Sequence, residues 1–151
     1  MEWVTRQGVR LDRAAMIWLI RKYIDPDAKI TILPEAEVMT YAEEKGATPF
    51  HHPKAELRHQ GTRTGFDALR VRYEINDPAI ALMAMIHRGA ETSAKDLTQW
   101  SPGIDAVAGG MRRLAKTDQE YLLGITPLLD GLYQWCQDQL AQPGSRAARE
   151  E

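Results

Sequence analysis

The sequence predicts an α+β fold, predominantly helical, in which a few short strands pack with about six helices. Three observations predict it: the strand-forming runs are short, helices are expected both between and after them, and helix-forming segments cover most of the 151 residues. A chain of this length can bury one hydrophobic core. We therefore expect a single domain over residues 1–142. Residues 143–151 are small and charged, with nothing to bury, so we expect a disordered tail there.

The first half of the chain is expected to alternate strand and helix. Segment 11–24 is apolar on nearly all sides, which indicates a buried helix, and Asp25 before Pro26 ends it because that position disfavours the helical conformation. Residues 30–32 are β-branched and favour a strand. The expected elements are a strand over 2–6, a helix over 11–24, a strand over 29–33 and a helix over 35–45 that Gly46 closes.

The second half is expected to be helical after one long irregular segment. Residues 47–65 are polar, hold three of the four histidines, and have room for one more strand around 48–51. Irregular segments of this length in small domains are often functional. Asp77 and Pro78 suit the start of a helix. The remaining expected helices cover 66–73, 79–88, 104–115 and 118–140, the last bent at Pro127.

Composition narrows the classes of function. The chain has 19 Lys and Arg against 21 Asp and Glu, so it lacks the basic excess typical of nucleic-acid-binding proteins. Cys136 is its only cysteine, which excludes a disulfide within the chain and fits a reducing compartment. The longest apolar run, residues 14–20, is far shorter than the roughly 20 residues that cross a bilayer. With no secretory signal at the N-terminus, we expect a cytoplasmic protein without a membrane partner.

Three groups of segments carry a resemblance to a known family. They are WVTR (3–6), LDRAA (11–15) and WLIRKYID (18–25), then GATPF (46–50), ELRHQG (56–61) and FD (66–67), and finally IHRGAE (86–91). In their order and spacing they resemble the C-terminal domain of bacterial ChrB-type chromate-resistance proteins, over most of residues 3–91. The resemblance implies a role in resistance to chromate or to related oxidative and metal stress, beside an efflux pump.

The departures from the family pattern also carry predictions. Full-length regulators of this kind carry a further N-terminal region, which is not in this sequence. Together with the acidic balance, this predicts that the chain alone does not bind DNA, although a part in a chromate-responsive regulator stays an alternative. Met16 and Thr64 stand where the family often has cysteine, so a thiolate site is not expected. Cys136 is expected to be buried and inert.

A metal site is the first functional prediction. Glu56 and His59 are three residues apart, so on a helix they would face the same way and could ligate one ion together with Glu91. Imidazole and carboxylate ligands suit Fe, Mn or Zn better than Cu(I), and three protein ligands leave a coordination position open. Whether such a site is redox-active or sensory, and whether the protein is an enzyme, stays open. In the alternative interpretation, these three residues are ordinary polar residues in solvent.

The other histidines are weaker candidates. His87 lies four residues before Glu91, but the family pattern places an apolar residue at 87 and His or Arg at 88, so an ordinary half-buried histidine is the favoured interpretation. His51 and His52 are adjacent, and neighbouring residues of a strand point to opposite faces. They are therefore not expected to share an ion.

Arginines supply the alternative function, a non-enzymatic module that binds an oxyanion such as chromate. Guanidinium groups bind oxyanions through several fixed donors. The candidates are Arg6, Arg13 and Arg21, with Arg88 as the residue that matches the family's cationic position. Structural salt bridges to Asp12, Asp25 and Asp67 are the favoured interpretation of the first three. The expected partners are thus a small inorganic ion or oxyanion, with a homo-oligomer left open.

Overall fold

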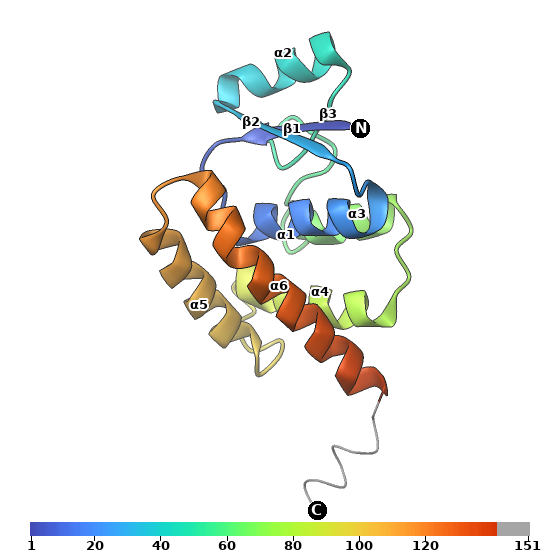
Figure 1. The fold of residues 1–151 in the computed structure, drawn as a ribbon. Coiled ribbons are helices and arrows are strands. Elements are labelled where there is room, and N and C mark those ends of the chain that lie inside the picture. The colour runs from blue at the N-terminus through green and yellow to red at the C-terminus, as the bar shows by residue number, and fades with distance from the viewer. Residues whose placement is uncertain (142–151) are drawn as a thin grey trace, which may run out of the picture.

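The computed structural model describes residues 1–141, and within them it has six α-helices and one three-stranded sheet (Figure 1). The predicted α+β, predominantly helical class is confirmed. The predicted tail, residues 143–151, lies outside the described residues. In chain order the elements are β1 (Glu2–Arg6), α1 (Leu11–Leu19), the π-helical turn η1 (Ile20–Ile24), β2 (Lys29–Leu33), α2 (Glu35–Lys45), β3 (Thr48–Pro49), α3 (Gly65–Arg72), α4 (Pro78–Glu91), α5 (Ser101–Leu114) and α6 (Asp118–Ala141).

The sheet has the order β2-β1-β3 and both pairings are parallel. Parallel neighbours need a crossover between them. The helix α1 with η1 connects β1 to β2, and α2 then carries the chain from β2 to β3, which lies on the other side of β1. The helix α2 lies on one side of the sheet and α1 on the other (Figure 1). On the α2 side, Val4 of β1 packs with Val38 and Ala42 in a small separate core. The central strand is therefore covered on both faces.

The main core lies around α1, whose nine residues are all buried. The helix packs against α3, α4 and α6, and α6 is tied to it by a hydrogen bond of 2.8 Å from Trp18 Nε1 to Asp130 Oδ1. Such complete burial includes two charged residues, Asp12 and Arg13, which are 3% and 5% exposed. A buried charge has to be compensated by partners. The groups that surround Asp12 and Arg13 are therefore where a functional site is to be sought.

Several element boundaries differ from the predicted ones. The predicted helix 11–24 turns π-helical at Ile20, where Asp25 N–H donates to the carbonyl of Ile20 at 2.7 Å. The predicted strand 48–51 is only two residues long, because His51 turns away with a φ of +49°. The helix α5 begins at Ser101 rather than at 104. Pro127 lies inside α6, which runs through it as one helix to Ala141.

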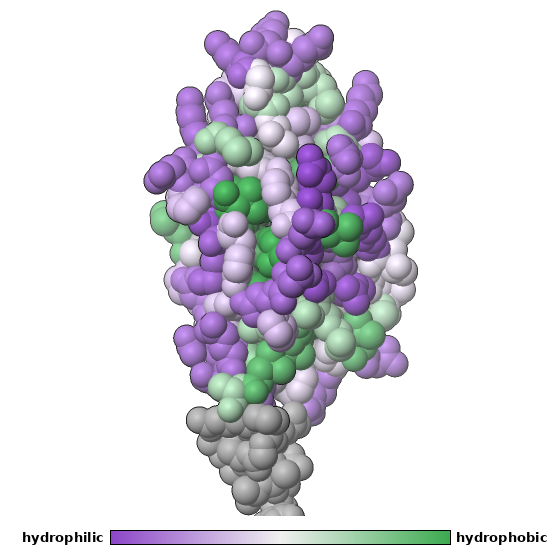
Figure 2. Space-filling view, turned by 90° about the vertical axis from the view of Figure 1, so that its right-hand side faces the viewer, coloured by the Kyte–Doolittle hydropathy of each residue, from purple (hydrophilic) through white to green (hydrophobic). Residues whose placement is uncertain are grey.

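The surface of the molecule is mixed. Figure 2 shows one face, on which polar side chains predominate and hydrophobic ones are interspersed, gathering toward the lower part of the view. Exposed large hydrophobic residues include Leu114 and Leu123. Among the described residues, no helix is both long and apolar enough to cross a membrane.

Candidate functional site

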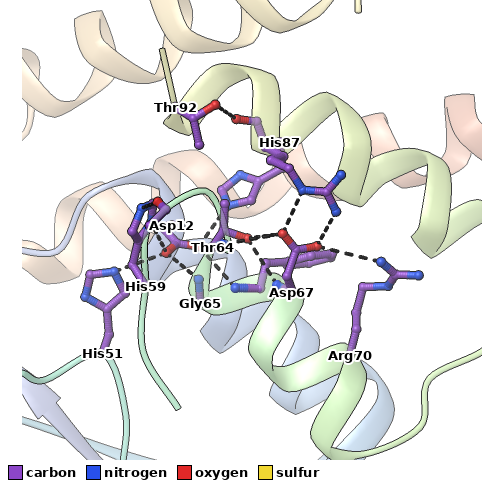
Figure 3. Close-up of polar contacts among 12 residues, drawn as sticks. Asp12, His51, His59, Thr64, Gly65, Asp67, Arg70, His87 and Thr92 are labelled. Carbon is purple, nitrogen blue, oxygen red and sulfur yellow. Dashed lines mark hydrogen bonds and ion pairs between the residues drawn. The ribbon is translucent and has the colours of Figure 1, made fainter. Parts of the chain in front are cut away.

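The carboxylate of Asp12 is the centre of a buried polar cluster (Figure 3). His87 Nε2 lies 2.8 Å from Asp12 Oδ1, and His51 Nε2 lies 3.1 Å from Oδ2. His59 Nδ1 lies 3.7 Å from Oδ2, which is an ion-pair distance but too long for a hydrogen bond. Asp12, His51, His59 and His87 are called the Asp12 cluster below. Three of the four histidines of the chain thus face one carboxylate.

The N-terminus of α3 supplies two further donors to the same carboxylate. Gly65 N–H donates to Asp12 Oδ2 at 2.8 Å, and Phe66 N–H donates to Oδ1 at 3.2 Å. The first N–H groups of a helix have no partner within the helix and favour an anion. A larger residue at position 65 would crowd this approach, since a Cβ there would lie 2.3 Å from the sulfur of Met16, which would have to move, and 3.0 Å from Asp12 Oδ2.

Backbone strain places His51 in the cluster. Its φ of +49° is in the left-handed region, which non-glycine residues adopt at a cost. Two hydrogen bonds hold it there, from His51 N–H to the carbonyl of Leu57 at 2.7 Å and from Arg6 Nε to the carbonyl of His51 at 3.0 Å. The adjacent His52 points elsewhere, with its Nε2 3.2 Å from the carbonyl of Glu35. His51 and His52 therefore have different partners. His51 belongs to the polar cluster, although the sequence did not indicate a functional role for it.

The other two histidines come from an irregular loop and from α4. His59 Nε2 donates to the carbonyl of Gly61 at 2.8 Å, which leaves Nδ1 facing Asp12. His87 is 2% exposed and its ring packs against that of Phe66, with centroids 5.5 Å apart. It is therefore fully buried rather than half-buried, and its partner is an anion. Four segments that are distant in the sequence meet at this one carboxylate.

Electrostatics in the cluster favour a charged Asp12. Burial alone would raise the pKa of Asp12, but the hydrogen bonds from His51 and His87 and the ion pair with His59 outweigh it and hold that pKa well below its ordinary value. The interaction with Asp12 is also the main reason why the pKa of His59 is raised. The cluster thus combines a firm negative charge with an imidazole that holds its proton more tightly than usual.

Glu91 is a second carboxylate beside the cluster. Burial raises its pKa, the charge of Asp12 raises it further, and the imidazoles of the cluster oppose the rise. These interactions show that Glu91 is close enough to respond to all four members. Within residues 1–141 its carboxylate has no hydrogen bond or ion pair. Burial of a charged carboxylate without a partner costs free energy, so an unpaired Glu91 is a candidate to bind a cation.

The predicted metal ligands are only partly brought together. His59 and Glu91 both lie at the Asp12 cluster, whereas Glu56 is exposed and makes no hydrogen bond or ion pair within the described residues. The segment from Glu56 to His59 is irregular, with bends on either side of a β-bridge residue, Leu57, so the helical spacing argued from sequence does not apply. A role for Glu56 as a ligand stays a prediction. Asp12, His51 and His87, which were not among the predicted site residues, lie in the cluster.

The predicted arginines do not line one pocket. Arg13 donates to the carbonyls of Arg6 and Gln7, the latter at 3.1 Å, and burial lowers its pKa to about 10. Arg6 pairs with Glu35 at 2.8 Å, and Arg88 forms a two-pronged pair with Asp67 at 2.7 and 2.9 Å. Arg21 is exposed, beside Trp18 and Asp130.

The salt bridges predicted for these arginines are wrong. Asp12 pairs with imidazoles, Asp25 pairs with the N-terminal amine of Met1 at 2.8 Å, and Asp67 pairs with Arg88. Cys136 is buried, as predicted, and burial raises the pKa of its thiol to about 11, which disfavours the reactive thiolate.

The side chains of the cluster face one another in this conformation. The nitrogens of His51 and His87 are directed at the Asp12 oxygens, and no three His, Cys, Asp or Glu side chains in residues 1–141 are arranged to hold a metal ion.

The sequence did contain a signal that could have predicted the cluster. Asp12 is the only acidic residue in a segment that is otherwise apolar on nearly all sides, and a buried carboxylate requires cationic or hydrogen-bonding partners.

Comparison with known proteins identifies the family. A model of the ChrB C-terminal domain matches residues 3–136. The chain belongs to this family. It is also 30% identical over 133 residues to Protein ChrB of Cupriavidus metallidurans, an alignment that covers 87% of this chain and 40% of that relative. No solved structure matches. The match confirms the family that the resemblance indicated, and the chain spans less than half the length of this relative.

Proposed function

We propose that this ChrB domain serves chromate or oxidative-stress resistance by binding a divalent transition metal at the Asp12 cluster. The observation that carries the proposal is the convergence of three imidazoles on one buried carboxylate, at 2.8, 3.1 and 3.7 Å. Donor atoms bound to one metal at about 2.1 Å are about 3.0 to 3.4 Å apart, in octahedral or tetrahedral geometry. The three separations between imidazole nitrogens and Asp12 oxygens span this range, from 2.8 to 3.7 Å, and the side chains would have to move to admit a metal among them.

His59 is already oriented as metal-binding histidines usually are. Its Nε2 donates to the Gly61 carbonyl at 2.8 Å, which fixes the proton there and leaves Nδ1 as the ligand atom. The Gly65 and Phe66 N–H groups would hold the Asp12 carboxylate in the same outer role. In the protonated form of His59, a metal would displace the second proton from Nδ1, so binding releases that proton.

His51 needs one adjustment. Binding at Nε2 leaves the imidazole proton on Nδ1, so the contact of 3.4 Å from the Arg13 guanidinium to that nitrogen has to lengthen. The strained φ of His51 supports a functional position, because strain of this kind persists where surrounding structure enforces it.

The charge of Glu91 also supports a bound cation. A bound divalent cation would stabilise both carboxylates, Asp12 and Glu91, and so account for a partly buried carboxylate that has no partner in the described residues. Carboxylate and imidazole ligands suit Fe, Mn or Zn. Iron or manganese would give a redox-active site, whereas zinc, which has no redox chemistry, would give a sensory or structural one.

The test compares two single variants of the same loop. His51→Asn removes one imidazole but keeps a residue that tolerates positive φ, and Glu56→Gln neutralises the exposed carboxylate nearby. We expect the wild type to carry metal after purification without chelator, by elemental analysis. The metal-free protein should melt several degrees higher with added Mn²⁺, Zn²⁺ or, without oxygen, Fe²⁺.

His51→Asn should lose most of this stabilisation, and Glu56→Gln should keep it. A wild-type protein that carries no metal and does not respond to any of the three ions would contradict the proposal. If Glu56→Gln loses the response while His51→Asn keeps it, the ligand set predicted from sequence is correct and the Asp12 cluster is not the site.

A further inference from the structure

A cavity of about 220 Å³ lies next to the Asp12 cluster, where the start of α1, the end of α4, α5 and α6 meet. Glu91 belongs to both places, because it lines the cavity and interacts with the charges of the cluster. Other side chains that line the cavity are Arg10, Lys95, Asp105, Arg112 and Tyr121. The cavity is thus rich in charged groups, with three cations and two carboxylates.

Tyr121 is the first sign that the cavity holds a ligand. The residue is 2% exposed, and its buried hydroxyl has no hydrogen-bond partner. Buried hydroxyls in folded proteins nearly always have a partner, and an exception indicates a missing water, ion or ligand. Burial raises the pKa of Tyr121 to about 12, with a further contribution from the charge of Glu91, so the hydroxyl is a neutral donor at physiological pH.

The cations give the second sign. The Arg10 side chain is exposed, and its guanidinium makes no hydrogen bond or ion pair within the part of the chain that the structure describes. Arg112 stacks over the Tyr121 ring at 5.1 Å, and one of its terminal nitrogens contacts the carbonyl of Val9 at 3.2 Å and Asp118 at 3.4 Å. A guanidinium has five N–H donors, so both arginines keep donors for a ligand.

The negative charges of the cavity are partly balanced. Asp105 pairs with Lys95 at 3.2 Å. Glu91 has a raised pKa and lies beside the cluster that we propose to bind a metal. The two arginines are therefore the cations that no carboxylate within the cavity neutralises.

We infer that this cavity binds a small oxyanion, held by Arg10 and Arg112 with the Tyr121 hydroxyl as a further donor. Two guanidinium groups and one hydroxyl match the several acceptor oxygens of such an ion. This site differs from the predicted one, which comprised Arg6, Arg13, Arg21 and Arg88. It goes beyond the proposed metal site, since its own residues can bind an anion without the metal. A bound metal should strengthen it by offsetting the charge of Glu91.

The experiment titrates the metal-free protein with sulfate, phosphate and chromate at constant ionic strength, with chloride as the reference, and follows the melting temperature. Arg10→Gln and Tyr121→Phe test the site, and Arg21→Gln is the matched control, an exposed arginine outside this cavity. We expect a saturable rise in the wild type and in Arg21→Gln. The dissociation constant should increase about 10-fold in Arg10→Gln and about 3-fold or more in Tyr121→Phe.

Tyr121→Phe keeps the inference testable, because it removes only a hydroxyl that has no partner and should fold as the wild type does. The inference is overturned if none of the three ions gives a saturable rise, or if both site variants respond as the wild type does. Loss of metal binding in His51→Asn with an unchanged oxyanion response would leave the inference standing. A failed oxyanion titration would likewise leave the metal proposal intact.

Discussion

Two buried aspartates, Asp12 on α1 and Asp67 on α3, occupy similar places in the fold and differ in their partners (Figure 3). Each lies against the start of α3, and each is bound by one of two consecutive residues of α4. Asp12 is 2.8 Å from His87 Nε2, whereas Asp67 accepts two hydrogen bonds from Arg88 at 2.7 and 2.9 Å. Asp67 also completes a capping box with Thr64 at the N-terminus of α3.

The difference between the two sites is the permanence of the positive charge. Burial by itself would raise the pKa of Asp67, but the hydrogen bonds and charge of Arg88 lower it below its ordinary value. Arginine stays protonated at any physiological pH, so this pair is a fixed structural bridge. A protonated imidazole, unlike a guanidinium, can release its proton in the physiological range, so in the proposed site a metal can displace the proton that His59 holds beside Asp12. Asp12 and Asp67 thus lie at similar positions in the fold. The type of side chain that pairs with each one distinguishes the structural bridge of Asp67 from the proposed metal site at Asp12.

The largest expected effect is the difference in metal affinity between variants of the two aspartates. Asp12→Asn should weaken metal binding by about 100-fold or more, because it removes the central ligand. Asp67→Asn should change metal affinity by less than about 3-fold while lowering the free energy of unfolding by about 1 to 3 kcal/mol, since Arg88 loses its partner. Titration against a competing chelator gives the affinities, and urea unfolding of the metal-free proteins gives the stabilities.

Urea unfolding also serves as the control, because it shows that Asp12→Asn is folded under the titration conditions. Equal metal affinities in the two variants would remove the functional distinction between the aspartates.

A change of pH should sharpen the same contrast. Metal affinity should rise with pH by up to about 10-fold per unit for each proton displaced, and level off above the raised pKa of His59. The Asp67 bridge has no group that titrates in this range. In the metal-free protein the sign is opposite: the stability from the His59–Asp12 pair is complete below His59's ordinary value of 6.5, and is lost as the pH rises through the raised pKa.

Unfolding of the metal-free protein from pH 5 to 9 measures this second effect, and His59→Gln should remove its contribution. A metal affinity that does not change over this range would indicate that no imidazole is a ligand.

Glu91→Gln should give the smallest effect. Because burial raises the pKa of Glu91, its ionised form destabilises the folded protein above the ordinary value of 4.5. Replacement by a neutral side chain should therefore raise the melting temperature of the metal-free protein at pH 7.5 by about 1 to 3 °C. The same variant should bind metal less tightly. A lower melting temperature at pH 7.5 would mean that the Glu91 charge has a stabilising partner.

Local sequence signals predicted the fold better than the site. The β-branched residues of β2, the Asp77 and Pro78 start of α4, and Gly46 after α2 act within a few residues of themselves. The Asp12 cluster depends on long-range packing. His87 is 75 residues from Asp12 along the chain, and His51 reaches the carboxylate only because β3 ends early and its φ is positive.

The irregular loop shows why the ligand prediction was incomplete. Glu56 and His59 were grouped on the assumption of a helix, whereas the segment is held by turns and by the bridge between Phe50 and Leu57. His59 lies in the Asp12 cluster and interacts electrostatically with Glu91, and their role as ligands stays a prediction. The signal that sequence reasoning underused was the burial of Asp12, because a carboxylate on an apolar helix implies that cationic or hydrogen-bonding groups are present to meet it.

X-ray absorption of the zinc-loaded protein tests the central claim most directly, because it counts imidazole ligands at the metal. The account predicts nitrogen and oxygen neighbours at about 2.0 to 2.2 Å with the outer-shell scattering of two or three imidazoles, and one imidazole fewer in His51→Asn. Zinc with no imidazole scattering, or the same imidazole count in the wild type and in His51→Asn, would contradict it.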